Sequence, residues 1–391
     1  MVWVLGAVSF LTDLASEMIY PLLPLFLFTA LGAGPFALGV IEGAAESTAS
    51  LLKVVSGAWT DRMRRRKPLV LWGYGLSSFV RPLIGLAGSW PWVLMMRMGD
   101  RIGKGLRTSP RDALIADVTE HDQRGAAYGV HRAMDHAGAV VGPLVAMSLL
   151  YLGFSLQQVF LLSVIPGVLV VLIIVVGVKE SETPFPVSPT FTLPLDGGGK
   201  GRGWRKLGPD FQRLLWALFV FTLGNSTDAF LLLRLSDAGL SPGWIAGLWS
   251  VLHVVKSGCT AWGGRLADQW GSRPPILVGW LVYAACYGVF GWTTHSAVLV
   301  STFLFYGVYF GLTEPAERKW VARLASTEVR GSAFGYYHGV IGFGALPASL
   351  LFGALWSAAG PAAAFGTGAG LALLAALLLL RVEEPHSSQH V

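Results

Sequence analysis

The strongest constraint in this sequence is a succession of long apolar runs, because about 20 predominantly apolar residues can cross a bilayer as one helix. Short links separate the runs, and we count twelve of them. They cover residues 3–30, 36–58, 68–88, 91–108, 125–151, 156–178, 211–235, 243–264, 275–293, 297–318, 331–357 and 362–381. Since lipid tolerates only helices and closed barrels, the sequence predicts an all-α membrane protein with twelve transmembrane helices.

Composition supports this class. Of the 391 residues, 53% are hydrophobic and only 13% are charged, about half the charged share of a soluble domain. The net charge of +6 comes mostly from the links, so we expect the lipid bilayer, and no nucleic acid, as a partner. Cys259 and Cys286 lie in apolar runs, which argues against a disulfide framework. The first run lacks a basic leader and carries Asp13, so we do not expect a cleaved signal peptide.

The links alternate in charge, which predicts the topology. The second, fourth and later even-numbered links hold the Lys and Arg residues, whereas Asp237 is the one charge in the odd-numbered links. Because positive links stay in the cytoplasm, we expect a multi-pass protein of the plasma (inner) membrane with both termini cytoplasmic. We expect it to act as a monomer.

Residues 179–210 differ from the other links. They contain several prolines, then Gly197–Gly199, then a basic end, a composition typical of a linker. We therefore predict a six-helix bundle over 1–178, a cytoplasmic linker over 179–210 and a second six-helix bundle over 211–391.

The two predicted bundles repeat each other in sequence. Gly57 and Asp61 recur 207 residues later as Gly264 and Asp268, and the run from Arg124 to Gly129 recurs 206 residues later. Thr12-Asp13 is echoed by Thr227-Asp228. Such a repeat predicts pseudo-symmetric bundles with a substrate site near mid-membrane between them.

The link between the second and third runs carries a basic motif. Gly57, Asp61, Arg62 and Arg65 fit the pattern G-x-x-x-D-R-x-x-R. A simple topogenic loop is one interpretation. The motif also resembles the loop between spans 2 and 3 of the major facilitator superfamily, although Arg64 replaces the usual glycine. The resemblance extends over the whole chain and implies that these residues, with Gly264 and Asp268, gate the cytoplasmic side.

Charged residues also occur inside the predicted spans, where each costs about 2.5–3.5 kcal/mol to insert. Asp13 and Glu17 share one helical face, and we expect them to bind the transported proton. Pro21 and Pro24 should bend the helix beyond them. In the second span we expect Glu42 to pair structurally.

Two further motifs resemble those of the family. Arg101-x-x-Lys104-Gly105 is similar to its span-4 motif R-x-x-Q-G, whose arginine is associated with proton transfer. Asp135 is a further proton-coupling candidate in the fifth span. The run from Gly138 to Gly142-Pro143 resembles the span-5 motif of the drug/proton antiporter branch and implies antiport.

These features lead to one main functional hypothesis. We expect a secondary active transporter, not an enzyme, that exports a small-molecule organic solute in exchange for protons by alternating access. Candidate substrate-binding residues are Glu46, His131, Asp228, His253 and His338. We expect no cofactor, since no nucleotide loop or hydrolase motif is present. The alternatives are divalent-metal export, with His131, Asp135, His136, Asp13 and His338 as ligands, or a membrane sensor or assembly factor without transport.

Overall fold

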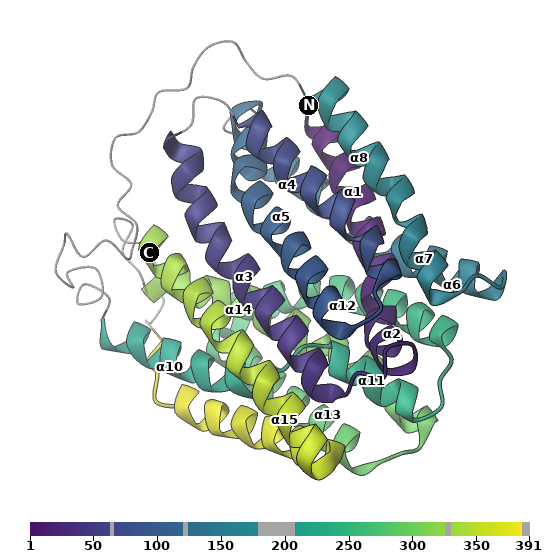
Figure 1. The fold of residues 1–391 in the computed structure, drawn as a ribbon. Helices are drawn as coiled ribbons and strands as arrows, with labels where there is room; N and C mark the ends of the chain where they lie inside the picture. Colours follow the sequence, from purple (N-terminus) through teal and green to yellow (C-terminus); the bar gives the residue numbers. More distant parts are fainter. Residues whose placement is uncertain (63–65, 120–123, 179–207, 325–329, 385–391) are drawn as a thin grey trace. The chain divides into compact units, whose positions relative to one another are not determined.

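The computed structural model describes residues 1–62, 66–119, 124–178, 208–324 and 330–384. The described residues form helices and no strand, as the sequence predicts (Figure 1). The first half contains α1 (Val2–Ile19), η1 (Tyr20–Leu22), α2 (Leu23–Thr29), α3 (Pro35–Arg62), α4 (Lys67–Val80), η2 (Pro82–Leu86), α5 (Trp90–Asp117), α6 (Arg124–Tyr151), α7 (Leu156–Leu162) and α8 (Val164–Gly177). The second half contains α10 (Pro209–Gly224), α11 (Ala229–Asp237), α12 (Pro242–Trp270), α13 (Arg273–Trp292), α14 (Ser296–Leu324) and α15 (Arg330–Leu379).

These helices correspond to the predicted spans. Among the described residues, eight helices or helix pairs are long and apolar enough to cross a membrane. One of them, Ala333–Leu379, is long enough for two crossings. It is interrupted at Gly360, where φ is +82° and ψ is 175°, within the predicted link before Pro361. The charge-bearing α3 and α5 are each 28 residues long and so also have the length of a span.

Several spans are broken, and the breaks have local causes. Pro21 and Pro24 interrupt the first span at η1, which confirms the predicted bend, and Pro82 begins η2. The seventh span is broken over residues 225–228, between α10 and α11. At an offset of 206 residues this break corresponds to Tyr20–Leu22, so equivalent spans are interrupted at equivalent positions.

Tyrosines satisfy the polar groups at the second break. The Tyr283 hydroxyl donates to the carbonyl of Gly224 at 2.9 Å, and the Asn225 amide donates to the Tyr309 hydroxyl at 3.0 Å. Ser226 and Tyr287 share a hydrogen bond of 3.2 Å. Because lipid offers no partner for an unwound backbone, the bond from Tyr283 satisfies a carbonyl at the break, and the other two bonds satisfy polar side chains there.

The described chain forms two compact units. Unit 1 combines Met1–Leu193 with Asp228–His253, and unit 2 combines Pro194–Thr227 with Val254–Val391. In unit 1, α1 packs on α6, and α5 packs on α3 and α4. In unit 2, α15 packs on α10 and α13, and α13 also packs on α14. The division into bundles at 178 and 211 stays a prediction.

Small residues permit the closest of these helix contacts. A Cβ at Gly142 of α6 would lie 2.5 Å from the carbonyl oxygen of Leu14 on α1, and one at Gly138 would overlap the carbonyl of Phe10. Gly138 and Gly142 therefore allow α6 to pack closely on α1.

Candidate functional site

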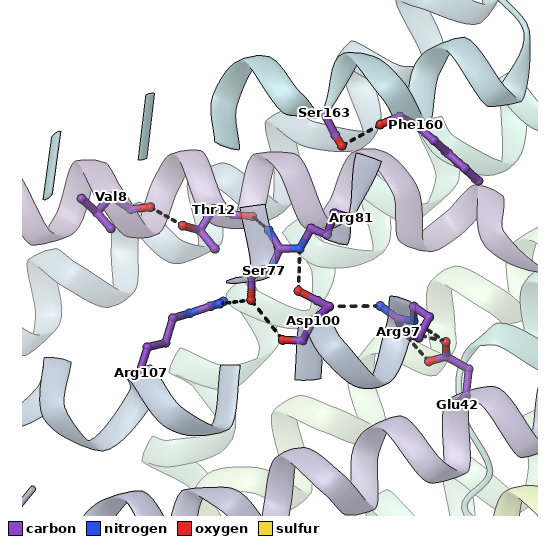
Figure 2. Close-up of polar contacts among 10 residues, drawn as sticks. All are labelled: Val8, Thr12, Glu42, Ser77, Arg81, Arg97, Asp100, Arg107, Phe160 and Ser163. Atoms are coloured by element: carbon purple, nitrogen blue, oxygen red, sulfur yellow. Dashed lines mark hydrogen bonds and ion pairs between the residues drawn. The ribbon is translucent and has the colours of Figure 1, made fainter. Parts of the chain in front are cut away.

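The interior of unit 1 contains a buried network of charged side chains (Figure 2). Arg97 on α5 holds both oxygens of Glu42 on α3, at 2.7 and 2.8 Å from Nη2. On its other side Nη1 of Arg97 lies 3.6 Å from Oδ2 of Asp100. All three side chains are buried. Glu42 is therefore structurally paired, as the sequence analysis expected.

Arg81 completes this network from the end of α4. Its Nε donates to Oδ1 of Asp100 at 2.7 Å, and its Nη1 donates to the carbonyl of Thr12 on α1 at 2.9 Å. Asp100 is thus balanced by two arginines, Arg81 and Arg97. Ser77 and Arg107 extend the network by a hydrogen bond of 2.6 Å between them. These contacts fix four spans to one another. Arg81 was not among the predicted residues.

Asp13, next to Thr12 on α1, lies in different surroundings from Asp100. Its side chain is half-buried, and no hydrogen bond or ion pair within 4.0 Å joins it to a described residue. Its charged neighbours are Asp135, Lys104, Glu17 and Arg107. A carboxyl group in a span without a fixed counter-ion is unusual and points to function.

Glu17, one turn further along α1, is held by neutral or weakly basic groups. The indole N–H of Trp249 on α12 donates to Glu17 Oε2 at 2.8 Å. Nε2 of His253 lies 3.8 Å from the same oxygen. The rings of Trp249 and His253 meet edge to face at 5.1 Å. The structure therefore joins the predicted residues Glu17 and His253 through a tryptophan that the sequence analysis missed.

Cations surround Glu46 on α3. Its side chain is exposed, and its charged neighbours are Arg101, Lys104, Lys53 and Arg97. For Arg101 the strongest acidic neighbour is Glu46, followed by Asp100 and Glu42. The strongest acidic neighbours of Arg101 thus include neither Asp13 nor Glu17. Lys104 lies one turn further along α5. Of the cations near Asp13, it has the strongest electrostatic effect on that carboxyl group.

Asp135 and His131 form a third group, on α6. Asp135 accepts a hydrogen bond from Ser9 on α1 and lies 3.7 Å from Arg132. His131 is buried, and its Nε2 has no hydrogen-bond partner among the described residues. Asp135 interacts electrostatically with both Asp13 and His131. It therefore connects a predicted proton-coupling residue with a predicted substrate-binding residue.

The other predicted residues lie elsewhere. Asp228 stands at the start of α11, where its carbonyl accepts from the N–H groups of Leu231 and Leu232. Asp13 lies inside a helix instead, so the Thr-Asp echo does not mark equivalent positions. His338 is an exposed residue of α15 in unit 2 and packs on Tyr337, with ring centroids 5.0 Å apart.

Only part of the predicted gate lies in the described structure. Gly57, Asp61 and Arg62 fall in the last turns of α3, where their side chains are not described, and Arg65 lies outside the described residues. In the second copy, Lys319 donates to Asp268 at 2.6 Å and to the carbonyl of Ala267 at 2.8 Å.

The close helix approach in this second copy involves a neighbour of the predicted glycine. A Cβ at Gly264 would meet nothing nearer than Pro315, at 3.9 Å, whereas one at Gly263 would overlap the carbonyl of Gly311 on α14. Gly263, and not Gly264, is therefore the residue that α14 requires to be small.

Within the described residues, the site contains carboxylates that can bind and release protons, and it contains no cluster of metal ligands. No group of three or more His, Cys, Asp or Glu is placed to hold a metal ion within those ranges. The cations beside these carboxylates attract them when they are ionised and no longer do so once a proton is bound.

Comparison with known proteins identifies the family. The model of the Major Facilitator Superfamily matches residues 5–330 and 260–391. An uncharacterised MFS-type transporter of Methanocaldococcus jannaschii is 32% identical over 386 residues, which cover 97% of this chain and 94% of that protein. The multidrug resistance protein MdtH of Proteus mirabilis is 30% identical over 149 residues, 38% of this chain and 37% of MdtH.

Solved structures agree in fold. A bacterial homologue of the human lysosomal transporter Spinster, facing inward, has a TM-score of 0.73 at 20% identity, covering 97% of this chain and 94% of that chain. A mutant form of the nucleoside transporter NupG has a TM-score of 0.79 at 13% identity, covering 97% of this chain and 98% of that chain. The chain therefore belongs to the Major Facilitator Superfamily and is a multi-pass membrane transporter, not an enzyme.

Proposed function

We propose that this transporter exports a small organic solute in exchange for protons. One observation carries the proposal: Asp13 lies inside a membrane-spanning helix, among charges of both signs, without a fixed partner in the described structure. Asp100, in the same unit, is held by Arg81 and Arg97 at 2.7 and 3.6 Å. A carboxylate that is already neutralised has little reason to take up a proton, whereas an unpaired one has.

Two neighbours, Glu17 and Lys104, would affect how Asp13 binds and releases a proton. Glu17 is a second carboxyl group on the same face of α1, so binding a proton at one affects the other. Its contact with Trp249, which bears no charge, leaves that carboxylate without full compensation. Lys104 can attract the deprotonated form of Asp13 and release it once a proton is bound. In this proposal Lys104 takes the role that the family resemblance gave to Arg101, while Arg101 faces Glu46.

The solute would bind beside these groups in unit 1. Glu46, exposed yet surrounded by Arg101 and Lys104, supplies a carboxylate whose charge the solute can share. Trp249 offers an aromatic ring, which packs on Tyr20 at 5.1 Å. Export is favoured by the partial match to MdtH, a multidrug resistance protein. We place the transporter in the plasma (inner) membrane with both termini cytoplasmic, gated by the loop that contains Asp61.

The test is transport by purified protein in proteoliposomes under an imposed pH gradient. A panel of organic cations, anions and divalent metal ions supplies the candidate substrates. We expect Asp13→Asn and Glu17→Gln each to abolish accumulation driven by the gradient, while solute exchange without a gradient continues in part. Glu314→Gln, which alters an exposed pair with Arg318, is the control and should leave both activities intact.

Two outcomes would reject the proposal. Full gradient-driven accumulation by both neutral variants would mean that the proton uses other groups. Transport of a divalent metal ion, with no organic solute moved, would favour the metal exporter instead.

A further inference from the structure

A carboxyl group in unit 2 is buried without a cation. Glu317 on α14 is 8% exposed and lies seven residues before the end of the helix at Leu324. Its Oε2 accepts a hydrogen bond of 2.9 Å from the hydroxyl of Tyr337 on α15. No Lys, Arg or His among the described residues forms an ion pair with it within 4.0 Å.

The groups around Glu317 come from three helices. On α14 itself, Glu314 and Arg318 are its charged neighbours, and these two pair with each other at 2.5 Å on the exposed side. From α15 comes Tyr337, on which His338 packs. From α13 comes Trp280, which is fully buried. The indole N–H of Trp280 lies beside the carboxyl group, yet it makes no hydrogen bond of normal distance and angle with a described residue.

The internal repeat shows that this arrangement is particular to unit 2. At the offset of 206 residues, Glu317 corresponds to Arg111 and Tyr337 to His131. In unit 1, Arg111 pairs with Asp112 at 2.7 Å, and Asp135 is a further acidic neighbour. The equivalents of Asp112 and Asp135 are Arg318, which is turned to Glu314, and the apolar Ile341. At this position of the repeat, unit 1 therefore holds a cation paired with a carboxylate, whereas unit 2 holds a carboxyl group without a cation.

We propose that Glu317 is a second proton-binding site, built by α13, α14 and α15 and separate from Asp13. A buried carboxylate without a cation is costly, so the group is stable when it carries its own proton. Deprotonation would require a further donor, and the indole N–H of Trp280 is the unused donor beside it. Loss of the proton would therefore draw Trp280 and Glu317 together and change how α13 and α14 pack.

Protonation of Glu317 is independent of the proposed antiport. It can be observed in unit 2 without a substrate or a pH gradient. If Asp13 did not carry a transported proton, a protonated Glu317 would still be expected.

The test is infrared spectroscopy of the purified full-length protein in detergent, titrated from acid to alkaline pH. A protonated carboxyl group has a C=O band that its carboxylate lacks. We expect the band of the unmodified protein to persist at neutral pH and to lose one component in Glu317→Gln. Glu314→Gln should keep that component, since Glu314 is partly exposed and paired.

A second variant keeps the test decisive if Glu317→Gln folds poorly. Tyr337→Phe removes the hydrogen-bond donor but retains the acid, so the same component should move to higher frequency. A neutral-pH spectrum of Glu317→Gln identical to that of the unmodified protein would overturn the proposal. A Tyr337→Phe variant without a band shift would likewise overturn it.

Discussion

At the scale of single residues, side chains of the same type lie in opposite environments in this transporter. Glu42 is buried at 4% exposure and doubly bonded to Arg97, whereas Glu46, one turn away, is exposed among cations. Asp100 is fixed by arginines, and Asp13 is not. Whether a carboxylate is fixed in an ion pair therefore depends on the side chains packed against it and not on the residue type.

The Glu42–Arg97 pair provides a first prediction, on stability. Removing one partner of a buried ion pair leaves an uncompensated charge and typically costs about 3–5 kcal/mol. Glu42→Gln should therefore lower the melting temperature in detergent strongly. Glu314→Gln breaks an exposed pair, worth about 0–1 kcal/mol, and should change it little. Equal melting temperatures for the two variants would contradict a structural role for the buried pair.

At the scale of helices, small residues and broken segments determine which spans can approach. The α1–α6 contact depends on Gly138 and Gly142, and the α12–α14 contact depends on Gly263 and Gly311. In each case the glycine faces the backbone of the neighbouring helix. Substitution there must therefore move a whole helix and not just a side chain.

Gly263 and Gly264 form a matched pair for a second prediction. Gly263→Ala would place a methyl group against the carbonyl of Gly311, while Gly264→Ala would meet only Pro315 at 3.9 Å. We expect Gly263→Ala to lower both the yield of folded protein and its melting temperature. Gly264→Ala should match the unmodified protein in size-exclusion profile and melting. The reverse order would show that the helices contact through the motif glycine.

The end of the described chain also stabilises unit 2. The Glu384 carboxylate accepts hydrogen bonds of 2.5 and 3.2 Å from the backbone N–H groups of Ser272 and Arg273, at the start of α13. Nη1 of Arg323 lies 3.7 Å from Oε1 of Glu384. Gly271, with φ of +85°, leaves room for this carboxylate. The contact caps a helix in the way that an N-cap side chain does.

A third prediction concerns this cap. Glu384→Gln should weaken the hydrogen bonds to the two N–H groups, and Glu384→Ala should remove them at a cost of about 0.5–2 kcal/mol. Thermal unfolding measures both. Glu383→Gln is the control, because the contact of Glu383 with Asp210 uses its backbone N–H, at 3.2 Å. Equal loss from the Glu383 and Glu384 variants would argue that tail charge, and not the cap, matters.

At the scale of the whole molecule, the charge of the links sets the orientation in the membrane, and we expect both termini inside. Three of the short links between spans contain a glycine with positive φ, namely Gly32, Gly153 and Gly239. These links are the ones predicted to lie outside, where almost no charge occurs.

Single-cysteine labelling gives the fourth prediction. After replacement of Cys259 and Cys286, cysteines at Gly88 and Ser155 should react with an impermeant thiol reagent applied to intact cells. A cysteine at Gln269 should react only after permeabilisation, because it lies on the predicted cytoplasmic side. All three positions are exposed in the structure, so burial cannot account for a difference. Labelling of the cysteine at Gln269 in intact cells would show that the topology is the inverse of the predicted one.

The sequence by itself determined the fold class, the positions of the spans and several breaks. Hydropathy and helix-breaking residues act over a few neighbouring residues, so the apolar runs, Pro21, Pro24 and the link before Pro361 could be interpreted without a structure. The repeat at offsets of 206 and 207 residues likewise needed only the sequence. The family followed from these features and the basic motif, and comparison confirmed it.

Only the tertiary structure decided which charges pair. Helical spacing places Arg97, Arg101 and Lys104 on one face of α5, but it does not say which neighbouring helix that face meets. The structure pairs Arg97 with Glu42, and it places Arg101 and Lys104 near Glu46, with Asp13 a weaker acidic neighbour of Lys104. Trp249 and Arg81 were missed for the same reason: their partners, Glu17 and Asp100, are 232 and 19 residues away. Pairing across helices depends on how each helix is rotated and packed, and no local pattern in the chain encodes that.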